Sequence, residues 1–272
     1  MKKVCVIGLG EVGSEVFREI VKTIKEKPEL AEKYQVYGRD LNSTIEEKFL
    51  KEGYLIDSNP ELGRYDIYII CVYTTQQVIN IIKTIGELDD IAAPLIFIES
   101  TIDPSQYNYL SNILSCHLLE HTTAFVPHRF VPYDRNYWIF NIDRVFGVEN
   151  PEMRDHVLDF YGDFMDKKLI HFTNWKTAIL SKVVENTYRY WEIVLAQELQ
   201  RSCAMHNVDF VRLRNACNTK FNINIMQARD GVGGKCLPKD CGLFGNYFKE
   251  NIINQLAQVL NNRYKDELNE LH

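Results

Sequence analysis

The chain has 272 residues, of which 46% are hydrophobic and 25% charged, the balance of an ordinary globular protein. Its formal net charge of -6 argues against broad electrostatic binding to nucleic acid or to acidic membranes. No apolar run approaches the about 20 residues of a transmembrane helix, and the first 13 residues are typical of a strand and a turn rather than a signal peptide.

Strands and helices alternate over the first half of the chain, as the spacing of apolar residues indicates. In chain order, the pattern predicts strands at 3–7, 34–37, 67–72 and 94–98, with helices between them at 11–27, 44–51 and 76–85. This alternation is typical of a parallel sheet covered by helices on both faces. We therefore expect residues 1–172 to form an α/β domain, a doubly wound Rossmann fold.

After about residue 150 the pattern becomes mainly helical. It predicts a helix at 151–164, a last strand at 168–172, helices at 175–206 and 209–217, an irregular loop at 219–240, and helices at 241–251 and 253–271. The helix at 175–206 contains no Pro or Gly and far exceeds the average of about 11–12 residues. We expect residues 173–272 to form a helical domain and this long helix to make a homodimer; the alternative is a solvent-bridging helix in a monomer.

A glycine-rich turn follows the first strand. Gly8, Gly10 and Gly13 form GxGxxG between that strand and a helix, the context in which the motif binds a dinucleotide. Asp40 ends the second strand, where a carboxylate would accept hydrogen bonds from a ribose and favour NAD over NADP; Arg39 beside it weakens that preference. The predicted NAD-binding residues here are Gly8, Gly10, Glu11, Val12, Gly13 and Asp40. The alternative is a glycine turn in another doubly wound fold.

The seven cysteines are odd in number and include no CxxC pair, so we expect no disulfide framework and no metal site, and a cytoplasmic location. Cys236 stands apart, because it follows the glycines of GVGGKCLPKD at 231–240 and is flanked by Lys235 and Lys239. Nearby ammonium groups raise the thiolate fraction of a cysteine. A thiolate beside a nicotinamide could attack an aldehyde, whereas a structural cysteine in a tight turn is the alternative.

A third candidate lies on the long helix. Lys182 and Asn186 are four residues apart and therefore share one face. Together an ammonium and an amide could hold a substrate oxygen and stabilise negative charge on it, although an ordinary exposed helix face would carry the same pattern.

These stretches resemble the UDP-glucose/GDP-mannose dehydrogenase superfamily, especially its UDP-N-acetylmannosamine dehydrogenase branch. The resemblance is carried, in family order, by GLGEVG at 8–13, ESTIDP at 99–104, DRVFGVENPE at 143–152, KVVENTYRYWEIVLAQEL at 182–199 and NINIMQARDGVGGKCLPKD at 222–240. It implies an NAD domain, a long dimer-forming helix and a second nucleotide-binding domain. It also implies an enzyme that oxidises a primary alcohol of a nucleotide sugar to a carboxylate in two NAD-dependent steps.

The resemblance assigns roles to individual residues. Cys236 resembles the thioester-forming nucleophile, and Lys182 and Asn186 the pair that stabilises the oxyanion. Asp240 resembles the carboxylate that positions or activates the base or water, and Thr101 a residue near the nicotinamide and the catalytic water. Val72 and Thr74 occupy the family's VxTP motif near the cofactor, which here reads VYTT.

Three departures from the family pattern bear on function. The family's Pro-Glu motif reads Pro127-His128, so His128 would have to replace a glutamate linked to water activation; a neutral histidine can act as a base near neutral pH. The family's dimer-crossing arginine falls at Asn222, with Lys220 the nearest cation. The sequence ends at His272, where the family's nucleotide-binding domain would begin, so we expect that domain to be absent.

The residues leave three functions open. The first is an oxidoreductase acting on an alcohol or aldehyde of a sugar-like substrate through Cys236. The second is a two-electron dehydrogenase of the β-hydroxyacid type, which shares the Rossmann-plus-helical plan and a lysine and asparagine on a helix. The third is a non-catalytic NAD-binding partner subunit.

Overall fold

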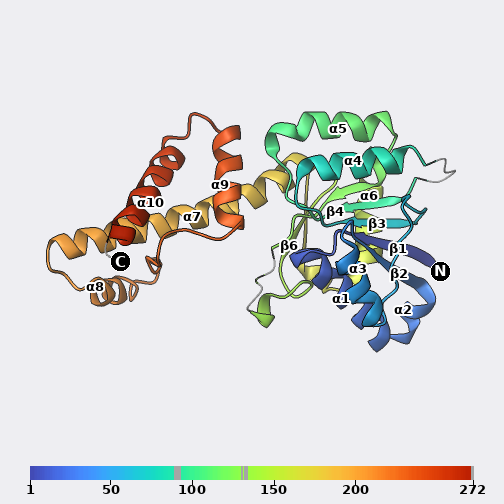
Figure 1. Ribbon diagram of the computed structural model, residues 1–272, viewed down its shortest axis with the longest axis horizontal. Helices are drawn as coiled ribbons and strands as arrows, with labels where there is room; N and C mark the ends of the chain where they lie inside the picture. The colour runs from blue at the N-terminus through green and yellow to red at the C-terminus, as the bar shows by residue number, and fades with distance from the viewer. Residues whose placement is uncertain (89–92, 130, 132–133, 271–272) are drawn as a thin grey trace. The chain divides into compact units, whose positions relative to one another are not determined.

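The computed structural model describes residues 1–88, 93–129, 131 and 134–270. The chain divides into two compact units, Met1–Leu180 and Ser181–His272. The first is an α/β unit and the second is helical, and Figure 1 shows both. The predicted fold class is confirmed. The division falls inside the long helix rather than before it, so the boundary expected at residue 172 stays a prediction.

The α/β unit contains a seven-stranded sheet with the order β2-β1-β3-β4-β5-β6-β7. Its strands are β1 (Lys2–Ile7), β2 (Tyr34–Arg39), β3 (Ile67–Ile70), β4 (Leu95–Ile98), β5 (Thr123–Phe125), β6 (Arg144–Gly147) and β7 (Ile170–Thr173). The order reverses between β1 and β3, which is the switch point where such sheets bind ligands at their carboxyl ends. The glycine-rich turn leaves the sheet at this point.

Side chains that alternate along the strands build two cores, one on each face of the sheet. Val4 and Val6 of β1 belong to the core made with α1 (Glu11–Glu26), α2 (Pro28–Lys33), α3 (Ser43–Lys51) and α6 (Pro151–Phe160). Cys5 and Ile7 belong to the core made with α4 (Thr75–Gly86) and α5 (Tyr107–Cys116). The alternation follows from the two-residue period of a strand. Helices on both faces explain why β3 is buried along its whole length.

The far end of the sheet departs from the expected parallel arrangement. β6 pairs with β5 in antiparallel register through Phe125 and Gly147, and β7 runs parallel to β6. The sequence pattern predicts neither β5 nor β6. β3 and β4 are equally short but stand out as unbroken apolar runs, IYII and LIFI, whereas β5 and β6 read TAF and RVFG and show neither such a run nor a clear period. Because β6 runs antiparallel to β5, Arg144 at the start of β6 lies near the carboxyl end of β5.

The helical unit consists of most of α7 (Trp175–Met205) with α8 (Phe210–Cys217), α9 (Cys236–Tyr247) and α10 (Ile252–Glu270). Two small cores hold α7 and α10 together, one around Tyr190 and Ile193 and the other around Ala196 and Tyr264. The long helix was predicted almost to the residue. The end predicted for the last helix, Leu271, lies outside the described residues.

The expected loop at 219–240 is wrong at its end, because α9 begins at Cys236 and not at Cys241. Pro238 explains the error. A proline is a helix breaker in the interior, but in the first turn its missing N–H would have no intrahelical partner anyway. Cys236 is therefore the first residue of a helix.

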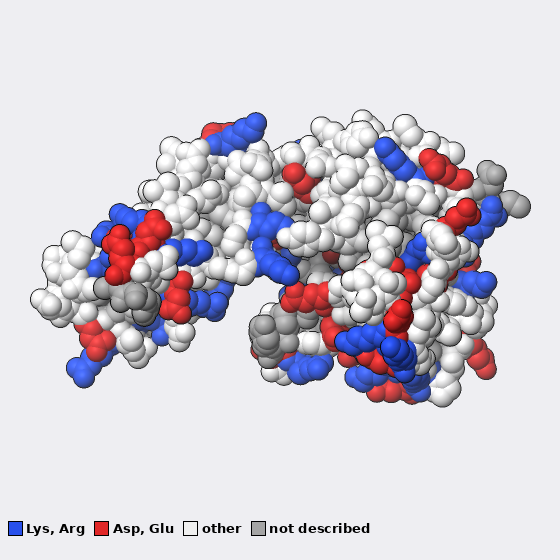
Figure 2. Space-filling view, viewed as in Figure 1, with Lys and Arg blue, Asp and Glu red and all other residues white. Residues whose placement is uncertain are grey.

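Within the described residues, no helix is long and apolar enough to cross a membrane. Acidic and basic side chains are interspersed on the face of the molecule that Figure 2 shows. The same residues contain no group of three or more His, Cys, Asp and Glu side chains arranged to hold a metal ion.

Candidate active site

The glycine-rich turn has the shape that a bound pyrophosphate requires. Gly8 has a φ of +90°, and a Cβ there would lie 2.6 Å from the carbonyl oxygen of Cys71. A Cβ on Gly13 would overlap the carbonyl oxygen of Gly8, whereas one on Gly10 would meet no described atom within 4 Å. The first and third glycines are thus required by close packing, and the second leaves open space over the turn.

That open space lies at the beginning of α1. Among the described residues, no side chain caps this helix end at Gly10, so its first N–H groups are available to an anion. Glu11 is exposed in the first turn, while Val12 packs against the core of the α/β unit. The backbone at Glu11 and Val12 can therefore serve a phosphate, and the side chain of Val12 serves the fold. These residues fit a dinucleotide.

The carboxylate of Asp40 is held against the glycine-rich turn. One oxygen accepts a hydrogen bond from the N–H of Leu9 at 2.7 Å, and the other accepts one from Asn42 at 2.9 Å. These bonds fix the carboxylate at the end of β2, where the ribose of a dinucleotide would lie.

Arg39 points to a different partner. Its guanidinium donates to the carbonyl oxygens of Asn59 at 2.6 Å and Pro60 at 3.0 Å, and it pairs with the carboxylate of Asp57 at 3.3 Å. The side chain is only 11% exposed. Arg39 therefore holds the loop at 57–61 in place, and the role considered for it in binding a 2′-phosphate is not supported by this geometry.

Val72, Thr74 and Thr101 lie just beyond β3 and β4, at the same edge of the sheet as the glycine-rich turn. The N–H of Val72 donates to the hydroxyl of Ser100 at 2.9 Å, which ties the two strand ends together. Thr74 is the N-cap of α4 and forms a capping box with Gln77. Its hydroxyl is thus engaged in holding the helix.

His128 lies in a buried polar cluster that the sequence motifs did not reveal. Its Nε2 is 3.5 Å from one carboxylate oxygen of Glu99, which also lies 3.1 Å from Arg144. The other oxygen accepts a hydrogen bond from the hydroxyl of Tyr161 at 2.6 Å. Burial raises the pKa of Tyr161 well above its ordinary value, and the Glu99 charge adds to the rise. Burial is the largest influence on the pKa of Arg144 and lowers it, but Glu99, Tyr161 and Cys71 together raise the pKa above its ordinary value, so Arg144 stays charged.

Three predicted catalytic residues meet in the helical unit. Asn186 donates a hydrogen bond to Asp240 at 2.5 Å, and Lys182 is near enough to affect the pKa of Asp240. Thr187, which the sequence did not single out, donates to the carbonyl oxygen of Asp240 at 3.4 Å. Asp240 is 1% exposed. Burial raises its pKa above the ordinary value, although Asn186, Lys239 and Lys182 each lower it.

Cys236 is exposed and begins the helix on which Asp240 lies. The two residues are four apart and so share a face of α9. A residue at the position of Cys236 lies beside the free N–H groups at the beginning of a helix. Thr101 and His128 belong to the other unit, and their convergence with Cys236 stays a prediction.

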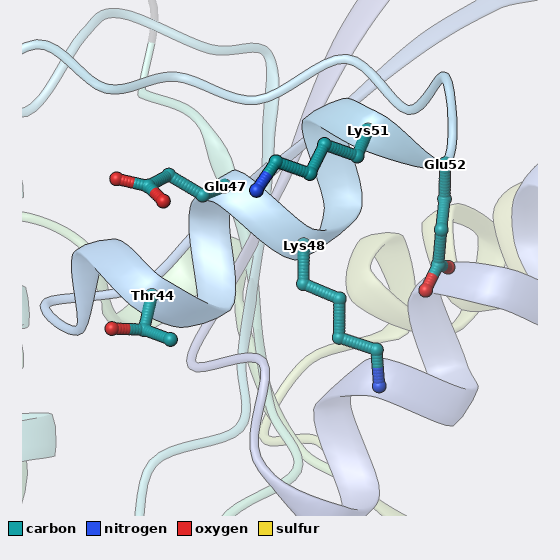
Figure 3. Close-up of a pocket in the computed structure, with 5 residues that line it drawn as sticks. All are labelled: Thr44, Glu47, Lys48, Lys51 and Glu52. Carbon is teal, nitrogen blue, oxygen red and sulfur yellow. The ribbon is translucent and has the colours of Figure 1, made fainter.

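The hollow shown in Figure 3 is not part of this site. Thr44, Glu47, Lys48, Lys51 and Glu52 line it, and all five come from α3 and the residue after it. None of the predicted site residues, which all lie in the described part of the chain, takes part in it.

A dinucleotide-type turn on an α/β sheet, followed by a helical unit with a lysine, an asparagine and a cysteine, defines a dehydrogenase fold. Residues 176–263 match the model of the UDP-glucose/GDP-mannose dehydrogenase family, central domain. Residues 176–263 are thus similar to the central domain of that family, and the resemblance read from the motifs is confirmed.

Individual relatives agree with this assignment. The UDP-N-acetyl-D-mannosamine dehydrogenase of Methanocaldococcus jannaschii is 26% identical over 96% of this chain. The chain spans about 65% of the length of that relative.

Solved structures share the fold. The UDP-D-ManNAc dehydrogenase of Pyrococcus horikoshii aligns with a TM-score of 0.80 at 24% identity, covering 96% of this chain and 68% of that one. The 3-hydroxyisobutyrate dehydrogenase of Mycobacterium tuberculosis aligns with a TM-score of 0.73 at 13% identity, covering 94% and 91%. At these identities the likeness establishes the fold alone.

Proposed function

We propose that this protein is an NAD-dependent oxidoreductase that oxidises a primary alcohol or aldehyde of a sugar or nucleotide sugar through Cys236. The observation that carries the proposal is the contact of Asn186 with a buried Asp240, four residues after an exposed Cys236 at a helix start. Lys182 acts electrostatically on the same carboxylate. The family of the central domain and the names of the relatives support the substrate class.

Each residue has a role in this proposal. The thiolate of Cys236 adds to the carbonyl carbon of an aldehyde, and the oxygen that becomes negative is stabilised by Lys182 and by Asn186. Asn186 has two N–H donors, so one can hold Asp240 while the other faces the substrate. Loss of a hydride leaves a thioester on Cys236. Water then hydrolyses it to a carboxylate and returns the thiolate.

NAD is the proposed cofactor, and it supplies the hydride acceptor. The turn at Gly8, Gly10 and Gly13 would hold its pyrophosphate, with backbone groups of Glu11 and Val12, and Asp40 would hold its ribose. Val72, Thr74 and Thr101 would lie along the nicotinamide side. His128, whose Nε2 lies 3.5 Å from Glu99, is the proposed base that takes a proton from the attacking water.

We also propose a cytoplasmic homodimer. All seven cysteines lie in the described residues and are free, which supports a reducing compartment. Val184, Tyr188 and Leu195 of α7 are 41%, 59% and 69% exposed. Their spacing places them along one side of the helix, an apolar stripe suited to a second copy of the chain.

Two other functions remain. A two-electron β-hydroxyacid-type dehydrogenase would share the fold, as the M. tuberculosis structure does, but it would not need Cys236. A non-catalytic NAD-binding subunit is the other alternative. In that case Cys236 would alkylate no faster than Cys116, the other exposed thiol.

The test is a screen of nucleotide sugars and free sugar phosphates with NAD, monitored by NADH absorbance. We expect two NADH per substrate molecule, and no carboxylate product from Cys236→Ala. Cys116→Ala, which alters the other exposed thiol, is the matched control and should behave as the unmodified protein does. One NADH per substrate with an active Cys236→Ser variant would favour the β-hydroxyacid alternative.

A further inference from the structure

We infer that α10 positions Cys236: buried polar side chains on one face of this helix hold the backbone on both sides of the cysteine. The residues concerned are Asn254, Asn261 and Tyr264, and they are 1%, 3% and 7% exposed. The inference rests on the proposed function and adds positioning residues to it, because none of the three is proposed to touch the substrate or the cofactor.

The first anchor holds the chain before the cysteine. The side-chain oxygen of Asn261 accepts a hydrogen bond from the N–H of Val232 at 2.7 Å, and its NH₂ donates to the carbonyl oxygen of the same residue at 3.4 Å. One amide thus satisfies both backbone groups of a buried residue. The single hydroxyl proton of Tyr264 is shared between Gln200 of α7 at 2.8 Å and the carbonyl oxygen of Arg229 at 3.1 Å, so this attachment is weaker than that of Asn261.

The second anchor holds the chain after the cysteine. Asn254 donates to the carbonyl oxygen of Cys241 at 3.2 Å and accepts from the thiol of Cys241 at 3.0 Å. Trp191 of α7 also donates to its oxygen at 3.2 Å. Cys241 directly follows Asp240, so this anchor also fixes the carboxylate that Asn186 contacts.

The glycines directly before the cysteine give it little support. A Cβ on Gly233 or Gly234 would meet no described atom within 4 Å, and Gly234 has a φ of +76°. Cys236 itself is exposed. The position of the sulfur therefore depends on where the chain is held at Val232 before it and at Asp240 and Cys241 after it.

The two asparagines are not explained by stability alone. They are seven residues apart, which places them on the same face of α10 two turns from each other. Gln197 of α7 reaches Asn261 at 3.4 Å, so the amides lie in the contact between α7 and α10. Apolar side chains would pack there without the cost of burying amides. Unlike leucine, the two amides form hydrogen bonds to the backbone at Val232 and Cys241, on either side of Cys236.

The decisive comparison is Asn261→Leu against Asn262→Leu. Asn262 is the next residue of the same helix and is exposed, so it matches the substitution without touching the anchor. In Asn261→Leu we expect hydrogen exchange at the Val232 amide to accelerate by about tenfold or more, because its acceptor is lost. Displacement of the sulfur should lower kcat by about tenfold to 100-fold with KM for NAD unchanged. Asn262→Leu should change neither.

Two further measurements keep the test decisive. Tyr264→Phe retains the ring and removes only the hydroxyl, so it should fold, and it should accelerate exchange near Arg229 with a smaller loss of kcat. The alkylation rate of Cys236 relative to that of Cys116 should fall in Asn261→Leu, and this readout needs no turnover. If the protein reduces NAD with none of the sugars, the proposed function is refuted. The hydrogen-exchange and alkylation rates would then still test whether Asn261 positions Cys236. Unchanged exchange in Asn261→Leu, or faster exchange with unchanged kcat and alkylation ratio, would overturn the inference.

Discussion

At the scale of single residues, the sequence identifies the reactive groups better than it identifies their partners. Asp40, Lys182, Asn186 and Asp240 are recognisable from spacing and motif, whereas the contact of Asn186 with Asp240 is not. Arg39 is adjacent to Asp40 in sequence, yet its side chain is engaged with the loop at 57–61. Sequence adjacency cannot show this, because consecutive residues of a strand point to opposite faces.

The engagement of Arg39 leads to a prediction about cofactor choice. We expect Asp40→Ala to weaken NAD binding by about tenfold to 100-fold, since charged hydrogen bonds contribute about 1.5–3 kcal/mol. NADP binding should not overtake NAD binding, because Arg39 is not available to a 2′-phosphate. Titration of both cofactors, with Glu47→Ala on the exposed side of α3 as control, measures this. Preference for NADP in Asp40→Ala would show that Arg39 can be released.

Asp240 should cost the protein stability at neutral pH. Its folded-state pKa is raised above 3.8 by burial, so the folded state binds the proton more tightly than the unfolded state does. The contribution of this group to the free energy of unfolding is therefore greatest below pH 3.8 and decreases as the pH rises through the raised pKa.

Asp240→Asn removes that pH dependence. We expect the variant to be more stable than the unmodified protein at pH 7 in urea denaturation, with a difference that shrinks as the pH is lowered. Its turnover should fall by about tenfold or more, because the lysine and asparagine lose their charged partner. A variant that is less stable at pH 7 would contradict the assignment of burial as the dominant cause.

At the scale of helices and strands, long periodic segments were predictable and short or context-dependent ones were not. α1, α4 and α7 show a full apolar stripe or a long uninterrupted run, which fixes their type. β5 and β6 are short and lack the unbroken apolar run that marks β3 and β4, and the start of α9 was hidden by Pro238. The cluster around Glu99 escaped notice for a related reason. It joins β4, β6 and the turn after α6, and only the antiparallel register of β6 brings them together.

This cluster gives a stability prediction. Glu99→Gln should lower the free energy of unfolding by about 3–5 kcal/mol, because it leaves the charge of Arg144 buried without its partner. Tyr161→Phe removes only one hydrogen bond and should cost about 1–3 kcal/mol. Urea denaturation of both variants measures the difference. Equal and small losses would mean that Arg144 is compensated by Val126, to whose carbonyl oxygen it also donates.

At the scale of the whole molecule, the fold class followed from the order of elements, whereas assembly does not follow from one chain. The stripe of Val184, Tyr188 and Leu195 supports a dimer by its exposure.

Leu195→Asp should place a charge in that contact and yield a monomer in light scattering at micromolar concentration. Leu118→Asp, at an exposed leucine of the α/β unit, is the control and should keep the mass of the unmodified protein. A monomeric unmodified protein would remove the dimer from the proposal.

The fully buried pair of Glu99 and Arg144 also has a consequence for how the protein responds to warming. Hydration of ions becomes less favourable as temperature rises, so the penalty for keeping this pair out of water shrinks, while hydrophobic stabilisation per unit area levels off. On heating, the junction of β4, β5 and β6 should therefore lose less of its contribution to the free energy of unfolding than the purely apolar parts of the same sheet do. A hot environment would favour keeping these two charges, and a cold one would favour exchanging them for hydrocarbon.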